Sequence, residues 1–244
     1  MRRFVTTLAF CVGLGTLPAL AGPPYVTDDP EPTPTGHFEI YAFGGGTMTR
    51  DGHEGETGID FNYGGAEDLQ LTAVLPLAYE TPSHHGTRAG IGNIELAAKY
   101  LFLHEDDVGW DVSVFPRLFL PSLSAHVGDK HASFLLPLWV GRDFGDWSTF
   151  GGGGCALNNG EDSKNYCQAG WALTRKVLPE LTLGAEIYHQ TADTHGGKAS
   201  TGLGFGATYD LSENYHLMAS YGPGIQNAAE TDRRSWYAAL LMTF

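Results

Sequence analysis

The segment DLQLTAVLPLAYE, residues 68–80, alternates apolar and polar side chains along most of its length. Every leucine in it occupies an odd-numbered position, whereas Gln70 and Thr72 occupy even-numbered ones. Successive side chains of a β-strand point to opposite faces, so the segment predicts a long strand with one apolar and one polar face. Such a strand fits either a soluble sandwich or a transmembrane β-barrel.

The spacing of the turns decides between these two folds. The same alternation recurs over residues 94–102, 112–120, 181–187 and 203–209. Short turns are expected at residues 64–66, 105–109, 143–146, 178–180 and 212–214, and longer polar connections near 50–56, 82–89, 123–131, 158–164, 192–199 and 226–234. Short turns at one end and long loops at the other are typical of bacterial barrels, which have even strand numbers. We therefore predict an all-β protein, an antiparallel transmembrane β-barrel of about 12 strands.

Composition excludes several other classes of protein. The chain has 14 Lys and Arg against 28 Asp and Glu, a net charge of −14 that argues against a nucleic-acid partner. After the first 21 residues no apolar run is long enough for a membrane-spanning helix, and the 33 glycines disfavour a helix-rich fold. A content of 42% hydrophobic residues argues against disorder.

Three segments are expected along the chain. Residues 1–21 have a basic start, an apolar stretch and an Ala-x-Ala end, which predict a cleaved signal peptide for export. Residues 22–35 contain five prolines and predict an extended leader at the periplasmic end, entering the lumen as a partial plug. Residues 36–244 would form the barrel, and we expect the protein in the bacterial outer membrane.

Several motifs resemble a known family. PYVTDDPEP at residues 24–32, GIGNIELAAKY at 90–100 and RLFLP at 117–121 are similar to the outer-membrane transporter family named after the MetA pathway of phenol degradation. One departure is Asn93, where the family typically has Asp. The resemblance implies a barrel that moves small, often aromatic, solutes across the outer membrane.

Strand parity assigns a set of charged side chains to the lumen. These candidates for solute contact are Glu39, Asp60, Glu95, Lys99, Asp111, Arg117 and Glu186. Ion pairs across neighbouring strands are feasible among Glu95, Lys99, Asp111 and Arg117, and the cluster could select solutes by charge. The alternative is that these charges pair with one another and fill a narrow barrel.

The two cysteines after the signal segment lie symmetrically about one predicted loop. The midpoint between Cys155 and Cys167 falls at residue 161, so in a regular hairpin they face each other. Export favours oxidation, and a disulfide here would stabilise the fold by roughly 2–3 kcal/mol. A metal-binding pair or two free thiols are the alternatives.

Other motifs indicate no catalytic step and no cofactor. Six histidines fall in predicted outer loops, at positions 53, 84, 85, 126, 131 and 195, and polar loop filler is favoured there over a metal site. Gly202, Gly204 and Gly206 are not a phosphate-binding loop, because no helix pattern follows them. At a period of two they form an inward column that leaves room in the lumen or bends the wall.

These observations together favour a passive, porin-like transporter or channel for small, aromatic or otherwise hydrophobic solutes. Its expected partners are outer-membrane lipid, the barrel-assembly machinery and a small-molecule solute. The alternative is a sealed structural or adhesive barrel without transport. An enzyme that acts on lipid ranks third, because no strand serine pairs with His189, the lipid-facing strand histidine.

Overall fold

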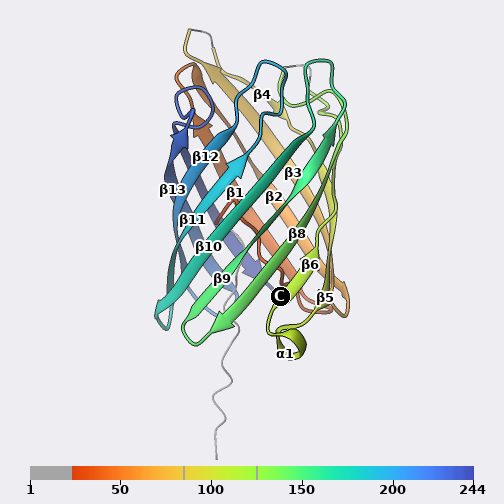
Figure 1. Cartoon of the computed structure of the whole chain (residues 1–244), viewed down its shortest axis with the longest axis vertical. Coiled ribbons are helices and arrows are strands. Elements are labelled where there is room, and N and C mark those ends of the chain that lie inside the picture. The colour runs from red at the N-terminus through yellow and green to blue at the C-terminus, as the bar shows by residue number, and fades with distance from the viewer. Residues whose placement is uncertain (1–23, 85, 125) are drawn as a thin grey trace, which may run out of the picture.

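The computed structural model describes residues 24–84, 86–124 and 126–244, so the expected signal peptide lies outside the described residues. The described residues form one antiparallel sheet and one short helix, α1 (Glu105–Val108) (Figure 1). The strands are β1 (Phe38–Met48), β2 (Gly52–Ala66), β3 (Leu69–Pro82), β4 (Arg88–Ile91), β5 (Glu95–Leu103), β6 (Asp111–Val114), β7 (Arg117–Phe119), β8 (Ser133–Phe144), β9 (Trp147–Asn158), β10 (Tyr166–Leu178), β11 (Leu181–Gln190), β12 (Ser200–Asp210), β13 (Tyr215–Gln226) and β14 (Arg234–Thr243).

The sheet closes into a barrel because β1 pairs with both β2 and β14. The strands β4 and β5 both pair with β3, and together they form one interrupted wall strand. The strands β6 and β7 form a second one, interrupted where Pro116 cannot donate a backbone hydrogen bond. The wall therefore has twelve strands, and the predicted antiparallel transmembrane barrel is confirmed.

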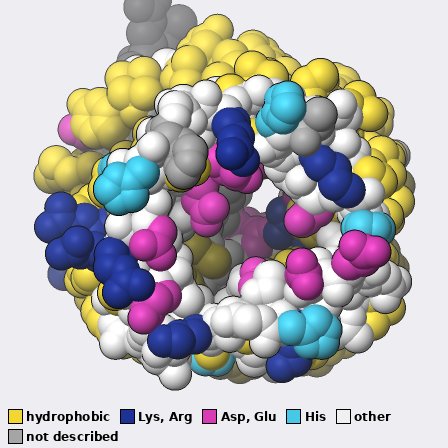
Figure 2. All heavy atoms as spheres, turned by 90° about the horizontal axis from the view of Figure 1, so that it is seen from above, with side chains coloured by type: hydrophobic (Ala, Val, Ile, Leu, Met, Phe, Trp, Pro, Cys, Tyr) yellow, Lys and Arg dark blue, Asp and Glu magenta, His cyan; other side chains and the backbone are white. Residues whose placement is uncertain are grey.

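The outward face of the wall is apolar. In the segment that first indicated a strand, Leu75 and Leu77 are 60% and 55% exposed, while Gln70 and Thr72 are buried inside. Seen from above, hydrophobic side chains surround the barrel (Figure 2). Such a continuous apolar surface is suited to contact with lipid rather than water. Within the described part of the chain, no helix has the length and apolar character needed to cross a membrane.

The two ends of the barrel differ in their connections. The end that we call the long-loop end carries the connections of residues 83–87, 120–132, 159–165, 191–199 and 227–233. The opposite, short-turn end carries α1 and the chain's last residue (Figure 1). One expected long connection is short, because β2 already begins at Gly52 and its residues 53–57 continue the pairing with β1. Another turn lies two residues later than expected, at Glu67 and Asp68, where Asp68 has a left-handed φ of 61°.

The predicted disulfide is confirmed. Cys155 on β9 and Cys167 on β10 are direct partners in the strand register, with their Cα atoms 3.9 Å apart. Both side chains lie on the outer face of the hairpin, near the long-loop end. The bond therefore ties two neighbouring strands together without entering the lumen.

Candidate functional site: the lumen and its leader

The leader, residues 24–35, lies inside the barrel. It enters at the short-turn end, where the backbone N–H of Gly36 donates to the carbonyl of Gly64. Further in, both the backbone N–H and the hydroxyl of Thr33 donate to Gln70 Oε1 on β3, over 2.8 and 3.1 Å. The described leader ends beside β13, where Ser220 Oγ donates to the carbonyl of Pro24 over 2.6 Å. The leader thus crosses the lumen from one wall to another.

Glu186 on β11 holds the upper part of the leader. Its carboxylate accepts hydrogen bonds from Val26 N and Thr27 N, each over 2.9 Å, and from Thr27 Oγ1 over 2.8 Å. Three donors on one carboxylate make a strong, directional contact, because hydrogen bonds to a charged group exceed those between neutral groups. Glu186 points into the lumen as its parity predicted, and it contacts the chain itself.

Lys99 on β5 holds the middle of the leader. Its Nζ lies 3.1 Å from Asp28 Oδ1 and 3.5 Å from Asp29 Oδ1, and it donates to the carbonyl of Glu31 over 3.2 Å. The Lys99 side chain is only 5% exposed. Burying an ammonium group without a partner is costly, so the two aspartates are what makes this position tolerable.

Arg117 and Glu95 form a second ion pair, which involves the wall alone and in which Glu95 is buried and Arg117 partly exposed. Arg117 Nε and Nη2 donate to the two Glu95 oxygens over 2.6 and 2.8 Å, bridging β7 and β5. The guanidinium also lies over the rings of Phe115 and Phe119, with its Cζ 5.4 and 5.5 Å from the ring centroids. This bidentate, stacked geometry fixes the arginine in place.

The remaining predicted lumen residues separate into two places. Glu39 and Asp60 line the same cavity as Lys99 and Arg117. Asp111 lies apart at the short-turn end, where its Oδ1 accepts the backbone N–H of Glu105 at the start of α1, over 2.7 Å. The four charges considered for cross-strand ion pairing therefore do not form one network.

Burial changes the ionisation of the leader carboxyls. Desolvation, followed by the charges of Asp143 and Asp111, raises the pKa of Glu31 to about 7. Desolvation also raises the pKa of Asp29, although the Lys99 ammonium opposes the rise. Both leader carboxyls are therefore easier to keep protonated inside the barrel than in water.

Inward glycines make room for the leader. A Cβ atom on Gly206 would lie 2.7 Å from a ring carbon of Tyr25, and one on Gly184 would overlap the Tyr25 hydroxyl. A Cβ atom on Gly170 would overlap the Thr27 hydroxyl. The sequence predicts the inward glycine column, which includes Gly206. It does not predict that the ring of Tyr25 in the leader fills the space beside Gly206.

Three cavities surround the leader, and Val26 borders all of them. The central cavity, of about 220 Å³, has charged lining from Asp28, Asp29 and Glu31 of the leader and from Glu39, Asp60, Glu95, Lys99 and Arg117 of the wall. The outer cavity, of about 450 Å³, lies toward the long-loop end. A side cavity of about 380 Å³ is lined in part by Tyr25, Phe43 and Tyr237. Figure 2 shows the long-loop end hollowed into a mouth edged by charged side chains.

The loop histidines that the structure describes do not gather into a metal site. Within residues 24–84, 86–124 and 126–244, no group of three or more His, Cys, Asp or Glu side chains is placed to hold an ion. His85, one of the six predicted loop histidines, lies outside the described residues.

Comparison with known proteins identifies the family. The model of the family described as "Putative MetA-pathway of phenol degradation" matches residues 24–235. The chain belongs to this family. The match confirms the resemblance seen in the sequence motifs, and it includes the leader as well as the barrel. No curated protein sequence matches this family member.

Solved structures share the architecture of this family member. The COG4313 outer membrane channel from Pseudomonas putida F1 is 15% identical, with a TM-score of 0.72 over 88% of this chain and 98% of that one. The NanC porin is 11% identical, with a TM-score of 0.56 over 84% and 98% of the two chains. The KdgM porin, solved in complex with disordered oligogalacturonate, is also 11% identical, with a TM-score of 0.55 over the same shares. At these identities the likeness concerns the fold.

Proposed function

We propose that the protein is a passive outer-membrane channel for small solutes, with a lumen narrowed by its own leader. The observation that carries the proposal is the hollow interior, in which three cavities border Val26 of the leader and one of them extends toward the long-loop end. An apolar outer wall around a polar, hollow lumen is the arrangement by which porin-like barrels pass solutes through lipid. No catalytic step is part of this function.

The orientation follows from the connections. Bacterial barrels keep their short turns in the periplasm and their longer loops outside the cell. The short-turn end, where the leader enters, would therefore face the periplasm, and the outer cavity would open toward the medium. Export by the signal segment at residues 1–21 and insertion by the barrel-assembly machinery belong to the same proposal.

The lining of the lumen supports small cations and neutral solutes as cargo. Six acidic and two basic side chains line the central cavity, and both basic groups are already paired. An excess of negative charge in a low-dielectric passage repels anions and attracts cations. The rings of Tyr25, Phe43 and Tyr237 beside the leader supply apolar contact for aromatic or hydrophobic solutes.

Single-channel recording tests the proposal. Protein purified from outer membranes is inserted into planar bilayers, and conductance and reversal potential are measured across a potassium chloride gradient. We expect discrete, small conductance steps with cation selectivity, and larger steps for a variant that lacks residues 22–35. A complete absence of conductance in both proteins would overturn the proposal in favour of a sealed barrel.

A further inference from the structure

Two residues that line the outer cavity carry buried side-chain polar atoms without a hydrogen-bond partner in the described chain. Its floor is formed by Val26 and Thr27 of the leader, and its walls include Trp139 of β8 and Tyr188 of β11. Only four buried side-chain polar atoms lack a hydrogen-bond partner within the described residues, and two of them, Trp139 Nε1 and Asp232 Oδ1, belong to residues that line this cavity. Buried polar groups are normally satisfied, so the cavity is a place where a ligand could supply the missing contact.

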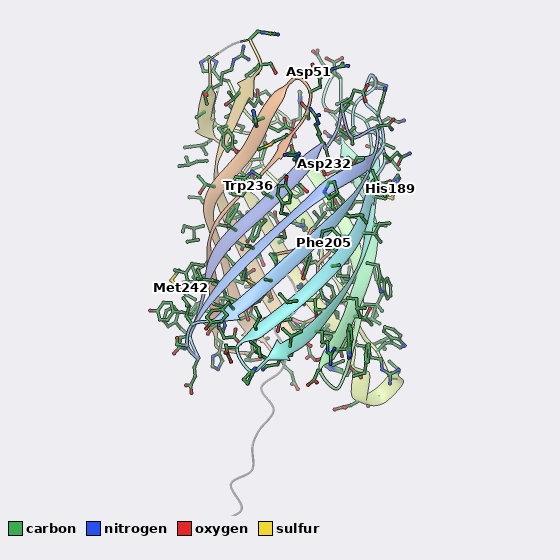
Figure 3. The ribbon with its side chains drawn as sticks, turned by 90° about the vertical axis from the view of Figure 1, so that its left-hand side faces the viewer. Asp51, His189, Phe205, Asp232, Trp236 and Met242 are labelled. Carbon is green, nitrogen blue, oxygen red and sulfur yellow. A yellow bond between two sulfur atoms is a disulfide. The ribbon has the colours of Figure 1, made fainter. Side chains whose placement is uncertain are left out.

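Only one of the two carboxylate oxygens of Asp232 has a hydrogen-bond partner in the described residues. The residue is 6% exposed and lies in the connection between β13 and β14 (Figure 3). The hydroxyl of Tyr188 donates a hydrogen bond to Asp232 Oδ2 and holds this carboxylate oxygen in place. The same hydroxyl lies 3.0 Å from Ser235 Oγ. The other oxygen, Oδ1, accepts nothing from the described part of the protein. A fixed carboxylate with one unused acceptor atom is suited to a donor from a ligand.

The charge around Asp232 determines what kind of donor fits. Four acidic side chains line the outer cavity, and the single basic one, Lys198, is paired with Glu230 at 3.2 Å. Desolvation raises the pKa of Asp232, although the hydrogen bond from Tyr188 opposes the rise. A cationic donor would supply both the hydrogen bond and the compensating charge, whereas an anion would meet repulsion.

We propose that the outer cavity is a binding site for small organic ammonium ions, held by the carboxylate of Asp232, with Trp139 and Tyr188 in the same lining. The inference rests on the proposed function, because it names the class of solute that the channel takes up first. The aromatic rings of Trp139 and Tyr188 provide the apolar part of the site, and aromatic faces also attract cations. The volume of about 450 Å³ is at the scale of small-molecule pockets.

Three ligands that share a ring and differ in charge test the class of solute. Benzylammonium, benzyl alcohol and benzoate are titrated into the full protein in detergent at pH 7 by isothermal calorimetry. We expect saturable binding of benzylammonium, affinity at least about tenfold weaker for benzyl alcohol, and no saturable binding of benzoate. Equal binding of the three ligands, or a preference for benzoate, would overturn the proposal. This series needs no substitution and remains decisive if a variant fails to assemble.

Matched substitutions test the residue. Asp232→Asn should weaken benzylammonium binding at least about tenfold and remove the preference over benzyl alcohol. Asp51→Asn is the control, because Asp51 carries the same charge at the long-loop end, has a side chain that is 77% exposed and does not line the cavity (Figure 3). Wild-type affinity in Asp232→Asn, or equal losses in both variants, would contradict a specific role for Asp232.

The calorimetry and the bilayer recordings can fail separately. Saturable ammonium binding without conductance would contradict the proposed channel function and support the proposed binding site. Conductance without any preference among the three ligands would contradict the proposed binding site and support the proposed channel function.

Discussion

The central and outer cavities both carry more acidic than basic side chains in their lining, but the acidic groups have different hydrogen-bond partners in the two places. In the central cavity, Lys99 meets Asp28 and Asp29 of the leader, and Arg117 meets Glu95. In the outer cavity, Asp232 keeps one oxygen without a partner in the described chain. A charged side chain in the lumen can therefore bind a solute only where no other group of the protein is already paired with it. In the central cavity the leader occupies the place of a ligand.

The largest expected effect comes from removing the cation of the central cavity. Lys99→Met leaves Asp29 buried without compensation and should weaken leader docking by about 3–5 kcal/mol. We expect the leader to become sensitive to limited proteolysis and single-channel conductance to increase. Lys198→Met removes a cation from the outer cavity, where the partly exposed pair with Glu230 contributes about 0–1 kcal/mol, and should leave the leader protected. Equal protection in both variants would contradict the comparison.

A smaller effect is expected at the second anchor of the leader. Glu186→Gln keeps the size of the side chain but removes the negative charge of the carboxylate that accepts hydrogen bonds from Val26 N and Thr27 N. The loss should reduce the free energy of leader docking by about 1.5–3 kcal/mol. Hydrogen–deuterium exchange at the amides of Val26 and Thr27 measures the loss directly. Glu230→Gln, at the outer cavity, is the control and should leave these amides slow.

A purely steric change should come next in size. Gly206→Ala would place a Cβ atom 2.7 Å from the ring of Tyr25 and should cost the docked leader about 1–3 kcal/mol. The barrel itself should keep its stability, because alanine is acceptable in a strand. Gly196→Ala in a long loop, where the added atom meets nothing within 4 Å, is the control. Proteolysis of the leader and thermal unfolding of the barrel, measured together, separate docking from folding.

The two regions should also differ in the sign of their pH dependence. Glu31 has a pKa of about 7 when docked against an ordinary 4.5, and it faces Asp143, Asp111, Glu39 and Lys99. The contribution of Glu31 to docking is therefore fully present below about pH 4.5 and is lost as the pH rises through about 7. Asp29, whose pKa is also raised, changes docking in the same direction.

The outer cavity should respond in the reverse sense. Because the pKa of Asp232 is raised, a higher pH ionises the carboxyl and strengthens the binding of benzylammonium, as long as the amine stays protonated. Leader protection and ammonium affinity, measured between pH 4 and pH 8, should therefore move in opposite directions. Glu31→Gln should flatten the first curve without changing the second, and parallel curves would contradict the assignment.

Local patterns in the sequence were sufficient to predict most strands of the barrel wall. The alternation over residues 68–80 predicts β3 because strand parity depends only on neighbouring residues, and the same parity places Cys155 opposite Cys167. Parity also assigns Glu186 and Lys99 to the lumen, where the structure has them. The start of β2 was missed because residues 53–57 carry no apolar alternation, although they pair with β1 through their backbone.

The contents of the lumen were harder to predict. Thr27 and Glu186 are 159 residues apart, and no local pattern connects them. Asp28 and Asp29 carry no local signal of a partner, because Lys99 reaches them only once the barrel has closed. The pairing of Tyr188 with Asp232 depends in the same way on two strands and a loop that meet only in the folded chain.

The leader is covalently continuous with β1, and this continuity makes it a tethered ligand. Whenever it leaves the lumen, its docking residues remain within about twelve residues of Gly36, which is hydrogen-bonded to Gly64 at the rim. Its effective concentration at the docking site is then set by the length of the tether, in the millimolar range for short flexible links, and not by the amount of protein in the membrane. An opening caused by leader release would therefore close again at a rate that is the same in a sparse and in a crowded membrane.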